Sequence, residues 1–273
     1  MQVERRSLSA IENELLFSKW CRRNGIEHFL FDGDDTVWAT IEIFRRFMSN
    51  CCDYLALNVP ALTRDEWEER MQEVNDAMFK THSVNPIRWK YVMAEIAREN
   101  VLLTSVKNRA TEILMQIYQT PPRFLDGAEE GLGFIKRSGI SFGVVTHANR
   151  HWTRQKYEWL QLSRFLDWDD VYVVDENGHK TEESWRQAIE YFHTRPERCA
   201  VVGDSPRSDI NPASMIGVEH RFLIKNQFER WPIHDQPVAP GTVMIPDIRE
   251  LIGLGGEYLI EYRSALPRSR DLP

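Results

Sequence analysis

The 273-residue sequence has few cysteines and no long apolar run, and each shortage excludes a class of protein. Its four cysteines form no CxxC pair, and the adjacent Cys51 and Cys52 are poorly placed to bond to each other, so a disulfide-rich secreted fold is not expected. No signal-peptide core, membrane span, low-complexity tract or fixed-period repeat is found. We expect a globular protein with free thiols in the reducing cytoplasm and with no membrane partner.

Basic residues are also in short supply. The chain has 34 Lys and Arg against 41 Asp and Glu, a formal net charge of −7, and its basic side chains occur only in short pairs such as Arg45 and Arg46. A basic stripe is the usual sign of a nucleic-acid binder, so nucleic acid is excluded as an expected partner. The negative charge would mildly repel an anionic substrate, so a phosphate site would need local compensation from a metal and a lysine.

The first 120 residues read as one helix, one short strand and then a helical block. Residues 9–22 have apolar side chains at helical spacing, and residues 28–31 are a short apolar run that stops at Asp32. From about residue 40 to 120, helical patterns follow one another without a strand pattern. Thr63 and Glu66 form a capping box that opens one of these helices. An all-helical module is therefore predicted.

After Phe124 the pattern changes to strands alternating with helices. Strands are expected at residues 140–146, 171–174, 199–203 and 220–224, with a short one at 243–245, and helices begin near residues 126, 150, 182 and 208. This alternation predicts an α/β fold with a doubly wound, Rossmann-like parallel sheet. Because the strand before Asp32 belongs to that sheet, we expect a core of residues 1–38 and 121–273, interrupted by a cap of residues 39–120.

Polar side chains stand where the predicted strands end. In open α/β sheets, ligands bind outside the carboxyl ends of the strands, so these residues are the candidates for chemistry. They are Asp32, Asp34 and Asp35 after the first strand, Thr146 and His147 after the second, Lys180 ahead of a helix, and Asp204 and Asp209 after the fourth.

These residue types suit phosphoryl transfer. Clustered carboxylates repel one another, and a hard divalent cation relieves that repulsion; ligands that are all oxygen favour Mg²⁺. A lysine and a threonine hydroxyl can hold phosphoryl oxygens. One carboxylate can attack phosphorus and form an aspartyl-phosphate, while a second passes a proton to the leaving oxygen and later takes one from water.

The same residues resemble the four motifs of the haloacid dehalogenase-like hydrolase superfamily. Phe31-Asp32-Gly33-Asp34-Asp35-Thr36-Val37 resembles the first motif, and Gly143-Val144-Val145-Thr146 resembles the second. Lys180 matches the lysine of the third, and the run from Val201 to Asp209 is similar to the fourth. Each motif alone is weak, but four in the right order are a strong signal, and the resemblance covers roughly half of the chain.

The resemblance implies a role for each matching position. Asp32 would be the nucleophile and a metal ligand, and Asp34 the general acid and base, with its backbone carbonyl on the metal. Asp204 would bind the metal, and Asp209 would do so directly or through water. The phosphoryl oxygens would be held by the side chains of Thr146 and Lys180, assisted by the backbone N–H groups of Gly33 and His147.

Two further features favour a phosphatase with a small substrate. The family's dehalogenases lack an acid at the position of Asp34, since a leaving halide needs no proton, whereas an alkoxide does. The helical block lies in the long gap between Asp32 and Thr146, which resembles the helical cap that closes over the site in one branch of the family. We therefore expect Mg²⁺-dependent hydrolysis of a small phosphorylated metabolite, of the nucleotide or sugar phosphate class.

Alternatives stay open at this point. An acidic run can be a loop or capping element, Lys156 competes with Lys180 for the lysine role, and Asp209 can be a charge at a helix N-terminus rather than a ligand. The chain can also be a catalytically silent binding or regulatory protein on the same fold, or a phosphomutase in which a second substrate accepts the phosphoryl group. The patterns leave oligomeric state and substrate identity open.

Overall fold

The computed structural model describes residues 10–175, 178–224 and 237–254. A short amino-terminal helix and strand lead into four helices, which are followed by the alternating strands and helices of an α/β core. The strands are β1 (His28–Phe31), β2 (Ser141–Thr146), β3 (Val171–Val173), β4 (Cys199–Gly203), β5 (His220–Ile224) and β6 (Val243–Ile245). The helices are α1 (Ala10–Arg23), α2 (Ile41–Asn58), α3 (Arg64–His82), α4 (Arg88–Glu99), α5 (Thr104–Met115), α6 (Ala128–Arg137), α7 (Arg150–Trp159), α8 (Glu182–Tyr191) and α9 (Asn211–Met215).

The six strands form one parallel sheet in the order β3-β2-β1-β4-β5-β6. The order reverses beside β1, which pairs with β2 on one side and with β4 on the other. Such a reversal leaves a crevice at the carboxyl ends of the neighbouring strands, because the connections on its two sides run in opposite directions. The predicted doubly wound, Rossmann-like sheet is confirmed.

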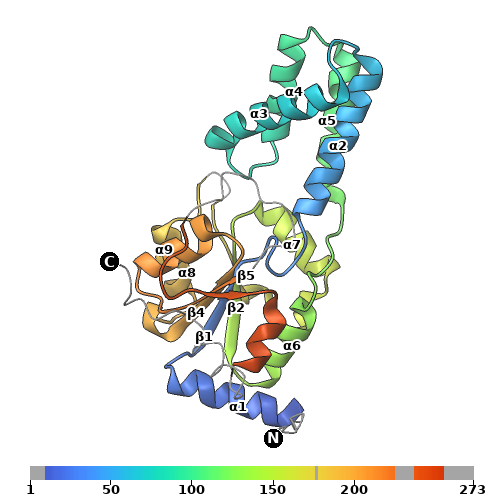
Figure 1. Cartoon of the computed structure of the whole chain (residues 1–273). Coiled ribbons are helices and arrows are strands. Elements are labelled where there is room, and N and C mark those ends of the chain that lie inside the picture. The colour runs from blue at the N-terminus through green and yellow to red at the C-terminus, as the bar shows by residue number, and fades with distance from the viewer. Residues whose placement is uncertain (1–9, 176–177, 225–236, 255–273) are drawn as a thin grey trace, which may run out of the picture.

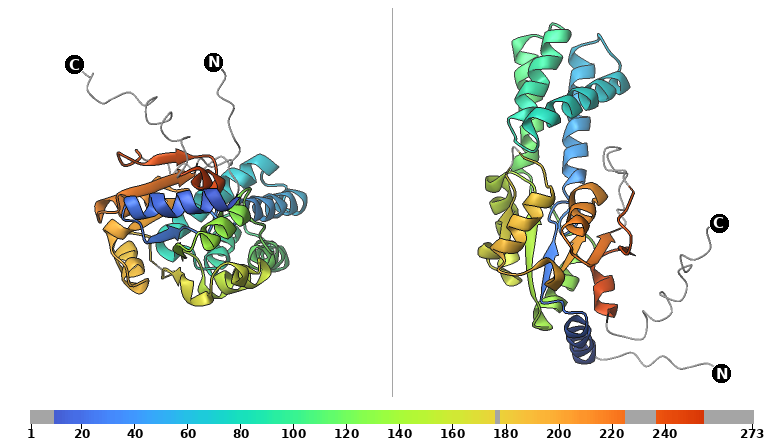
Figure 2. Two further views of the ribbon diagram at one scale, coloured as in Figure 1. Left: turned by 90° about the horizontal axis from the view of Figure 1, so that it is seen from below. Right: turned by 90° about the vertical axis from the view of Figure 1, so that its left-hand side faces the viewer.

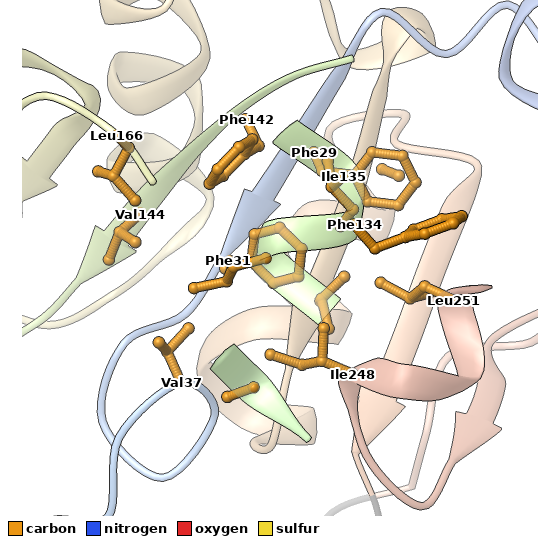
Figure 3. Close-up of a cluster of buried hydrophobic side chains, with 14 of the residues drawn as sticks. Phe29, Phe31, Val37, Phe134, Ile135, Phe142, Val144, Leu166, Ile248 and Leu251 are labelled. Atoms are coloured by element: carbon orange, nitrogen blue, oxygen red, sulfur yellow. The ribbon is translucent and has the colours of Figure 1, made fainter. Parts of the chain in front are cut away.

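Both faces of the sheet are covered, and β1 shows how its sequence serves both. Phe29 and Phe31 point into a large apolar cluster with α1, α6 and the 3₁₀ turn Ile248–Gly253, part of which is drawn in Figure 3. Leu30, between them, points to the opposite face and packs with residues of α8 and α9. A strand buried on both faces is apolar at every position, which explains the unbroken run Phe29-Leu30-Phe31.

Helices α2 to α5 gather at one end of the molecule, while α1 lies at the opposite end (Figures 1 and 2). They share an apolar cluster of their own, with Trp67, Trp89 and Leu55 fully buried. We call these four helices the helical cap. Trp152 of α7 joins this cluster from the core, with its ring centroid 4.8 Å from that of Tyr118. The expected domain boundaries at residues 38/39 and 120/121 remain a prediction.

Most predicted elements appear within one or two residues of their expected bounds, and the capping box of Thr63 and Glu66 is present. One expectation needs correction. In place of a helix starting at Ser208, the chain forms a π-helical turn, Pro206–Ile210, ahead of α9. Ser205 is the N-cap of this turn, since its hydroxyl accepts from the N–H of Ser208, and Pro206 follows it at the first position, where its missing N–H costs nothing.

The four cysteines are buried and free, as expected. In the described part of the chain, no helix is both long enough and apolar enough to span a bilayer. The predicted strand at residues 243–245 is confirmed as β6. The loop expected beyond Trp231 lies partly at residues 231–236, outside the described residues.

Candidate active site

The acidic residues of the first and fourth motifs meet at the reversal of the sheet. The backbone N–H of Asp32 donates to the carbonyl of Val202, so Asp32 directly follows β1 beside the end of β4. Asp204 follows Gly203, the last residue of β4. Carboxylate oxygens of Asp32, Asp204 and Asp209 all lie within 4.8 Å of one another. The topology thus brings together three acids that are far apart in the sequence.

Lys180 lies between two of these acids. Its Nζ is 2.6 Å from Oδ1 of Asp32 and 2.7 Å from Oδ1 of Asp209, and its side chain is almost fully buried. Burial alone would lower the pKa of Lys180, but the two carboxylates outweigh that effect and raise it, so the lysine stays charged. Lys180 contacts two of the three clustered carboxylates, and a divalent cation among the three would relieve their remaining mutual repulsion.

Burial raises the pKa of Asp32 to about 7; Lys180 opposes this shift and the charge of Asp209 adds to it. A divalent cation at this point would favour the ionised form, because it supplies opposite charge within contact distance. The donor set is made of carboxylate oxygens, which suits Mg²⁺ rather than a softer metal. Asp32, Asp204 and Asp209 therefore fit a magnesium site, with Asp209 partly committed to the N–H of Ser205 at 3.0 Å.

A glycine allows Asp209 to come this close. A Cβ placed on Gly203 would lie 2.5 Å from Cβ of Asp209, so a side chain at this position would push the acid away. The π-helical turn Pro206–Ile210 carries Asp209 back toward the strand end. Asp209 is 1% exposed, and it also lies in the first turn of that helical segment. This geometry supports the reading of Asp209 as a member of the acidic group.

Asp34 has a different environment from Asp32. Its Oδ1 accepts hydrogen bonds from Lys156 Nζ at 2.5 Å, from the Thr40 hydroxyl at 2.7 Å and from the indole N–H of Trp38. Burial raises the pKa of Asp34, but Lys156 and the other donors outweigh it, so the net shift is downward. Its side chain is not among the three clustered acids, so any metal contact would be through the backbone carbonyl, as the resemblance implies.

Lys156 is the residue whose role sequence reasoning did not assign. It is fully buried on α7, with its Nζ 3.9 Å from the ring centroid of Trp152 and 5.3 Å from that of Trp38. Lys156 and Lys180 contact different acids: Lys156 forms an ion pair with Asp34, and Lys180 forms ion pairs with Asp32 and Asp209. The spacing of four residues between Lys156 and Trp152 was the one signal available in the sequence, since residues four apart share a helix face.

Asp35, the third acid of the run, caps a helix. Its Oδ1 accepts from the backbone N–H groups of Thr40 and Ile41, at 2.8 and 2.9 Å, where α2 begins. It also has a positive φ of 61°, which turns the chain from the sheet toward the cap. The alternative that the acidic run caps a helix therefore applies to Asp35, one of its three acids.

The second motif places an unpaired hydroxyl at the site. Thr146 ends β2, is fully buried, and its Oγ1 has no hydrogen-bond partner among the described residues. A Cβ on Gly33 would clash with the Trp38 ring and lie 3.0 Å from that hydroxyl, so the backbone of Gly33 passes close to Thr146. A buried hydroxyl without a partner is costly, and a ligand oxygen would satisfy it.

His147 follows Thr146 and faces the cap. Its Nε2 lies 3.3 Å from the hydroxyl of Ser83, which follows α3, and the same hydroxyl donates to the carbonyl of Gly178. Burial and the nearby Lys180 lower the pKa of His147 to about 4, so its ring is neutral at pH 7. Through these contacts, Ser83 at the end of α3 packs against the core loops that contain His147 and Gly178.

All the candidate residues except Gly33 line one cavity of about 250 Å³, which also touches the cap. The core half of the cavity is lined by the acids, Lys180, Thr146 and His147. The cap half is mostly apolar and aromatic, with three polar exceptions in Asn75, Asp76 and Arg88. The cavity thus has a charged core half and a mostly apolar cap half, a combination suited to binding a small molecule.

The family follows from this architecture and from a direct comparison. A model of the haloacid dehalogenase-like hydrolases matches residues 26–217, more than half of the chain. The chain belongs to this family, and the resemblance drawn from the four motifs is confirmed. It is therefore a hydrolase of the haloacid dehalogenase-like type.

Individual relatives are more distant. A glyceraldehyde 3-phosphate phosphatase from Pyrococcus furiosus is 29% identical over 99 residues, which are 36% of this chain and 40% of that protein. A haloacid dehalogenase-like family hydrolase from Xanthomonas campestris superposes with a TM-score of 0.69 at 19% identity, over 87% of this chain and 95% of that one. A 2-haloacid dehalogenase from Pseudomonas syringae gives 0.56 at 18% identity, over 87% and 99%. These structural likenesses show the fold alone.

Proposed function

We propose that the protein is a Mg²⁺-dependent phosphatase that hydrolyses a small phosphomonoester through an aspartyl-phosphate on Asp32. The observation that carries the proposal is that Asp32 and Asp34, only two residues apart, have different ion-pair and hydrogen-bond partners. Asp32 lies in the acidic group with Lys180, and Asp34 is held outside it by Lys156, Thr40 and Trp38. This difference supports attack by Asp32 and proton transfer by Asp34.

In the first step an Asp32 oxygen attacks phosphorus, and the bond between phosphorus and the leaving oxygen breaks. Lys180 and the unpaired hydroxyl of Thr146 contact the phosphoryl oxygens, and the N–H groups of Gly33 and His147 would assist them, as the resemblance to the family implies. A magnesium ion held by Asp32, Asp204 and Asp209 would neutralise charge on the phosphoryl group. The product of this step is a phosphorylated Asp32 and a leaving alkoxide that needs a proton.

Asp34 supplies that proton and takes one back from water in the second step. All three of its donors go to Oδ1, and no donor among the described residues reaches Oδ2, so Oδ2 is the atom left for the proton. A bound phosphate dianion nearby raises the pKa of Asp34, because like charge disfavours the carboxylate. After the leaving group departs, the low pKa set by Lys156 favours the carboxylate that activates water.

Three other functions are compatible with the same fold. A dehalogenase is disfavoured by the acid at position 34, which a leaving halide does not need. A phosphomutase would pass the phosphoryl group to a second substrate instead of water, and labelled water separates the two. A silent binding protein is disfavoured by the buried carboxylates, which repel one another without serving binding of a neutral partner.

The proposal is tested by phosphate release from p-nitrophenyl phosphate and from a panel of phosphorylated metabolites with Mg²⁺. We expect Asp32→Asn to abolish release and chelation of Mg²⁺ to stop it in the unaltered protein. Asp35→Asn is the matched control within the same acidic run, since Asn keeps an oxygen for the cap of α2. Undiminished release by Asp32→Asn would contradict the proposal.

A further inference from the structure

The cap half of the cavity contains a buried cation with no acid partner. Arg88, the first residue of α4, is 5% exposed and lines the cavity. No carboxylate in the described residues lies within ion-pair distance of its guanidinium. Burial lowers the pKa of Arg88, and the charge of Asp76 acts from beyond ion-pair distance to raise it. Oδ1 of Asp76 accepts a hydrogen bond from the side-chain amide of Gln72 at 2.7 Å. A buried charge without a partner is unfavourable unless something else supplies the opposite charge.

The guanidinium is held in one orientation. Its central carbon lies 5.1 Å from the ring centroids of both Phe79 and Trp89, and Nη1 donates to the backbone carbonyl of Ser83. Nε is buried and has no hydrogen-bond partner among the described residues. The contact with Ser83 uses one of five N–H donors, so most of the fork remains for another group.

A second unpaired group lies on the neighbouring helix. Asn75 of α3 is 8% exposed and lines the same cavity, and its side-chain oxygen has no partner among the described residues. Buried polar groups in folded proteins are nearly all hydrogen-bonded. Two exceptions lining one cavity, one a charged donor and the other an amide, indicate that a ligand satisfies both.

The size of the cavity limits that ligand. Its volume of about 250 Å³ lies below the range of roughly 300–1,000 Å³ that is typical of pockets for drug-sized ligands. The phosphoryl group occupies the core half, beside Lys180 and Thr146. A compound of a few carbon atoms can therefore extend from the phosphoryl site toward the cap half.

We propose that the substrate carries a second anionic group, a carboxylate or a second phosphate, which binds Arg88 at the end of the cavity opposite the scissile phosphate. Asn75 hydrogen-bonds a polar group next to that anion. This inference rests on the proposed phosphatase function and adds the substrate class to it. It assigns Arg88 as the residue that selects the substrate.

Three compounds with a three-carbon chain test the inference, because they differ only at the far end. Glycerol 3-phosphate ends in a hydroxymethyl group, 3-phosphoglycerate in a carboxylate, and glycerol 1,3-bisphosphate in a phosphate. We expect kcat/KM of the unaltered protein to be higher for an anionic compound by roughly 10–100-fold, as for a hydrogen bond to a charged group. The better of the two anions identifies the group. Equal or better turnover of glycerol 3-phosphate would overturn the inference.

Variants locate the effect at Arg88. Arg88→Gln is expected to reduce kcat/KM for the preferred anion at least about tenfold more than for glycerol 3-phosphate, mainly through KM, and Arg88→Lys to recover part of the difference. Arg98→Gln, at an exposed arginine on the same helix, is the matched control and should keep the preference. A preference that survives Arg88→Gln would overturn the inference, and would leave Arg88 as a residue that only holds the Ser83 loop.

Failure of this inference is distinguishable from failure of the proposed function. Phosphate release from p-nitrophenyl phosphate, abolished by Asp32→Asn, tests the phosphatase alone, since that compound has no second anionic group. If release occurs without any preference among the three compounds, only the assignment of Arg88 is wrong. If Asp32→Asn has no effect on release, the proposed function itself is wrong.

Discussion

The polar groups in the two halves of the cavity differ in whether they have partners of opposite charge. In the core half, the polar residues lie at strand ends and in loops of the sheet, where Lys180 forms ion pairs with Asp32 and Asp209 and the Thr146 hydroxyl lacks a partner among the described residues. In the cap half, Arg88 and Asn75 stand among aromatic and aliphatic side chains with groups left unpaired. The core half has groups that can act on many substrates alike, whereas the unpaired groups of Arg88 and Asn75 in the cap half require a ligand with complementary groups.

The largest combined effect on activity and on folding is expected from Lys180→Met. It removes the cation from two buried carboxylates and from the phosphoryl site at once. We expect kcat to fall by about 10²–10³-fold or more, by analogy with loss of a transition-state donor. Steady-state phosphate release measures this. Since like charges then repel without compensation, thermal unfolding should depend more strongly on added Mg²⁺ than in the unaltered protein, and an unchanged dependence would contradict the arrangement described for Lys180.

Asp34→Asn should reduce activity by an amount that depends on the leaving group of the substrate. An alkoxide needs a proton on departure and a nitrophenolate does not, so we expect a loss of about 10²–10⁴-fold for alkyl phosphates and a much smaller one for p-nitrophenyl phosphate. Comparing kcat on the two substrate types is the measurement. Equal losses would remove Asp34 from the role of proton donor and leave it a structural residue.

Lys156→Met should weaken both the site and the fold. The variant keeps the apolar stem between Trp38 and Trp152 but leaves Asp34 with two donors. Because Asp34 is about a quarter exposed, we expect a loss of about 1–3 kcal/mol in the free energy of unfolding, less than for a fully buried pair. Urea denaturation gives this value, and Lys136→Met, at an exposed lysine, is the control.

The smallest effect concerns His147, which links the two halves through Ser83. Its pKa is about 4 in the folded protein and about 6.5 in the unfolded chain, so below pH 6.5 the unfolded state binds more protons. Stability is therefore lost as the pH falls from about 6.5 to 4. We expect His147→Gln to recover about 1–2 kcal/mol of that loss at pH 5. Parallel pH profiles for the two proteins would contradict this.

The core half could be predicted from the sequence because topology decides it. Once Phe29-Leu30-Phe31 is a strand of a parallel sheet, Asp32 must emerge at the same edge as Thr146 and Asp204, whatever the packing details. The position of Lys180 follows from its place ahead of α8. The order of strands and the four motifs thus carry the information directly.

The rest depends on packing that no local pattern encodes. Lys156 reaches Asp34 only because α7 presents one face to the loop after β1, and Arg88 enters the cavity only because α4 packs against α3. Asp35 is chemically identical to Asp32 and Asp34, and its use as a helix cap follows from where α2 begins. For the same reason, the sequence does not distinguish Arg88 from other arginines, such as Arg45 and Arg150, as a residue of the cavity.

The most direct test of the central claim is to look for the covalent intermediate on Asp32. The protein is mixed with Mg²⁺ and an alkyl phosphate, quenched in acid during turnover, digested and analysed by mass spectrometry. We predict a gain of one phosphoryl group on the peptide that contains Asp32, present in the unaltered protein and absent from Asp32→Asn. A phosphoryl group on another residue, or turnover by Asp32→Asn without any phosphorylated peptide, would contradict the account.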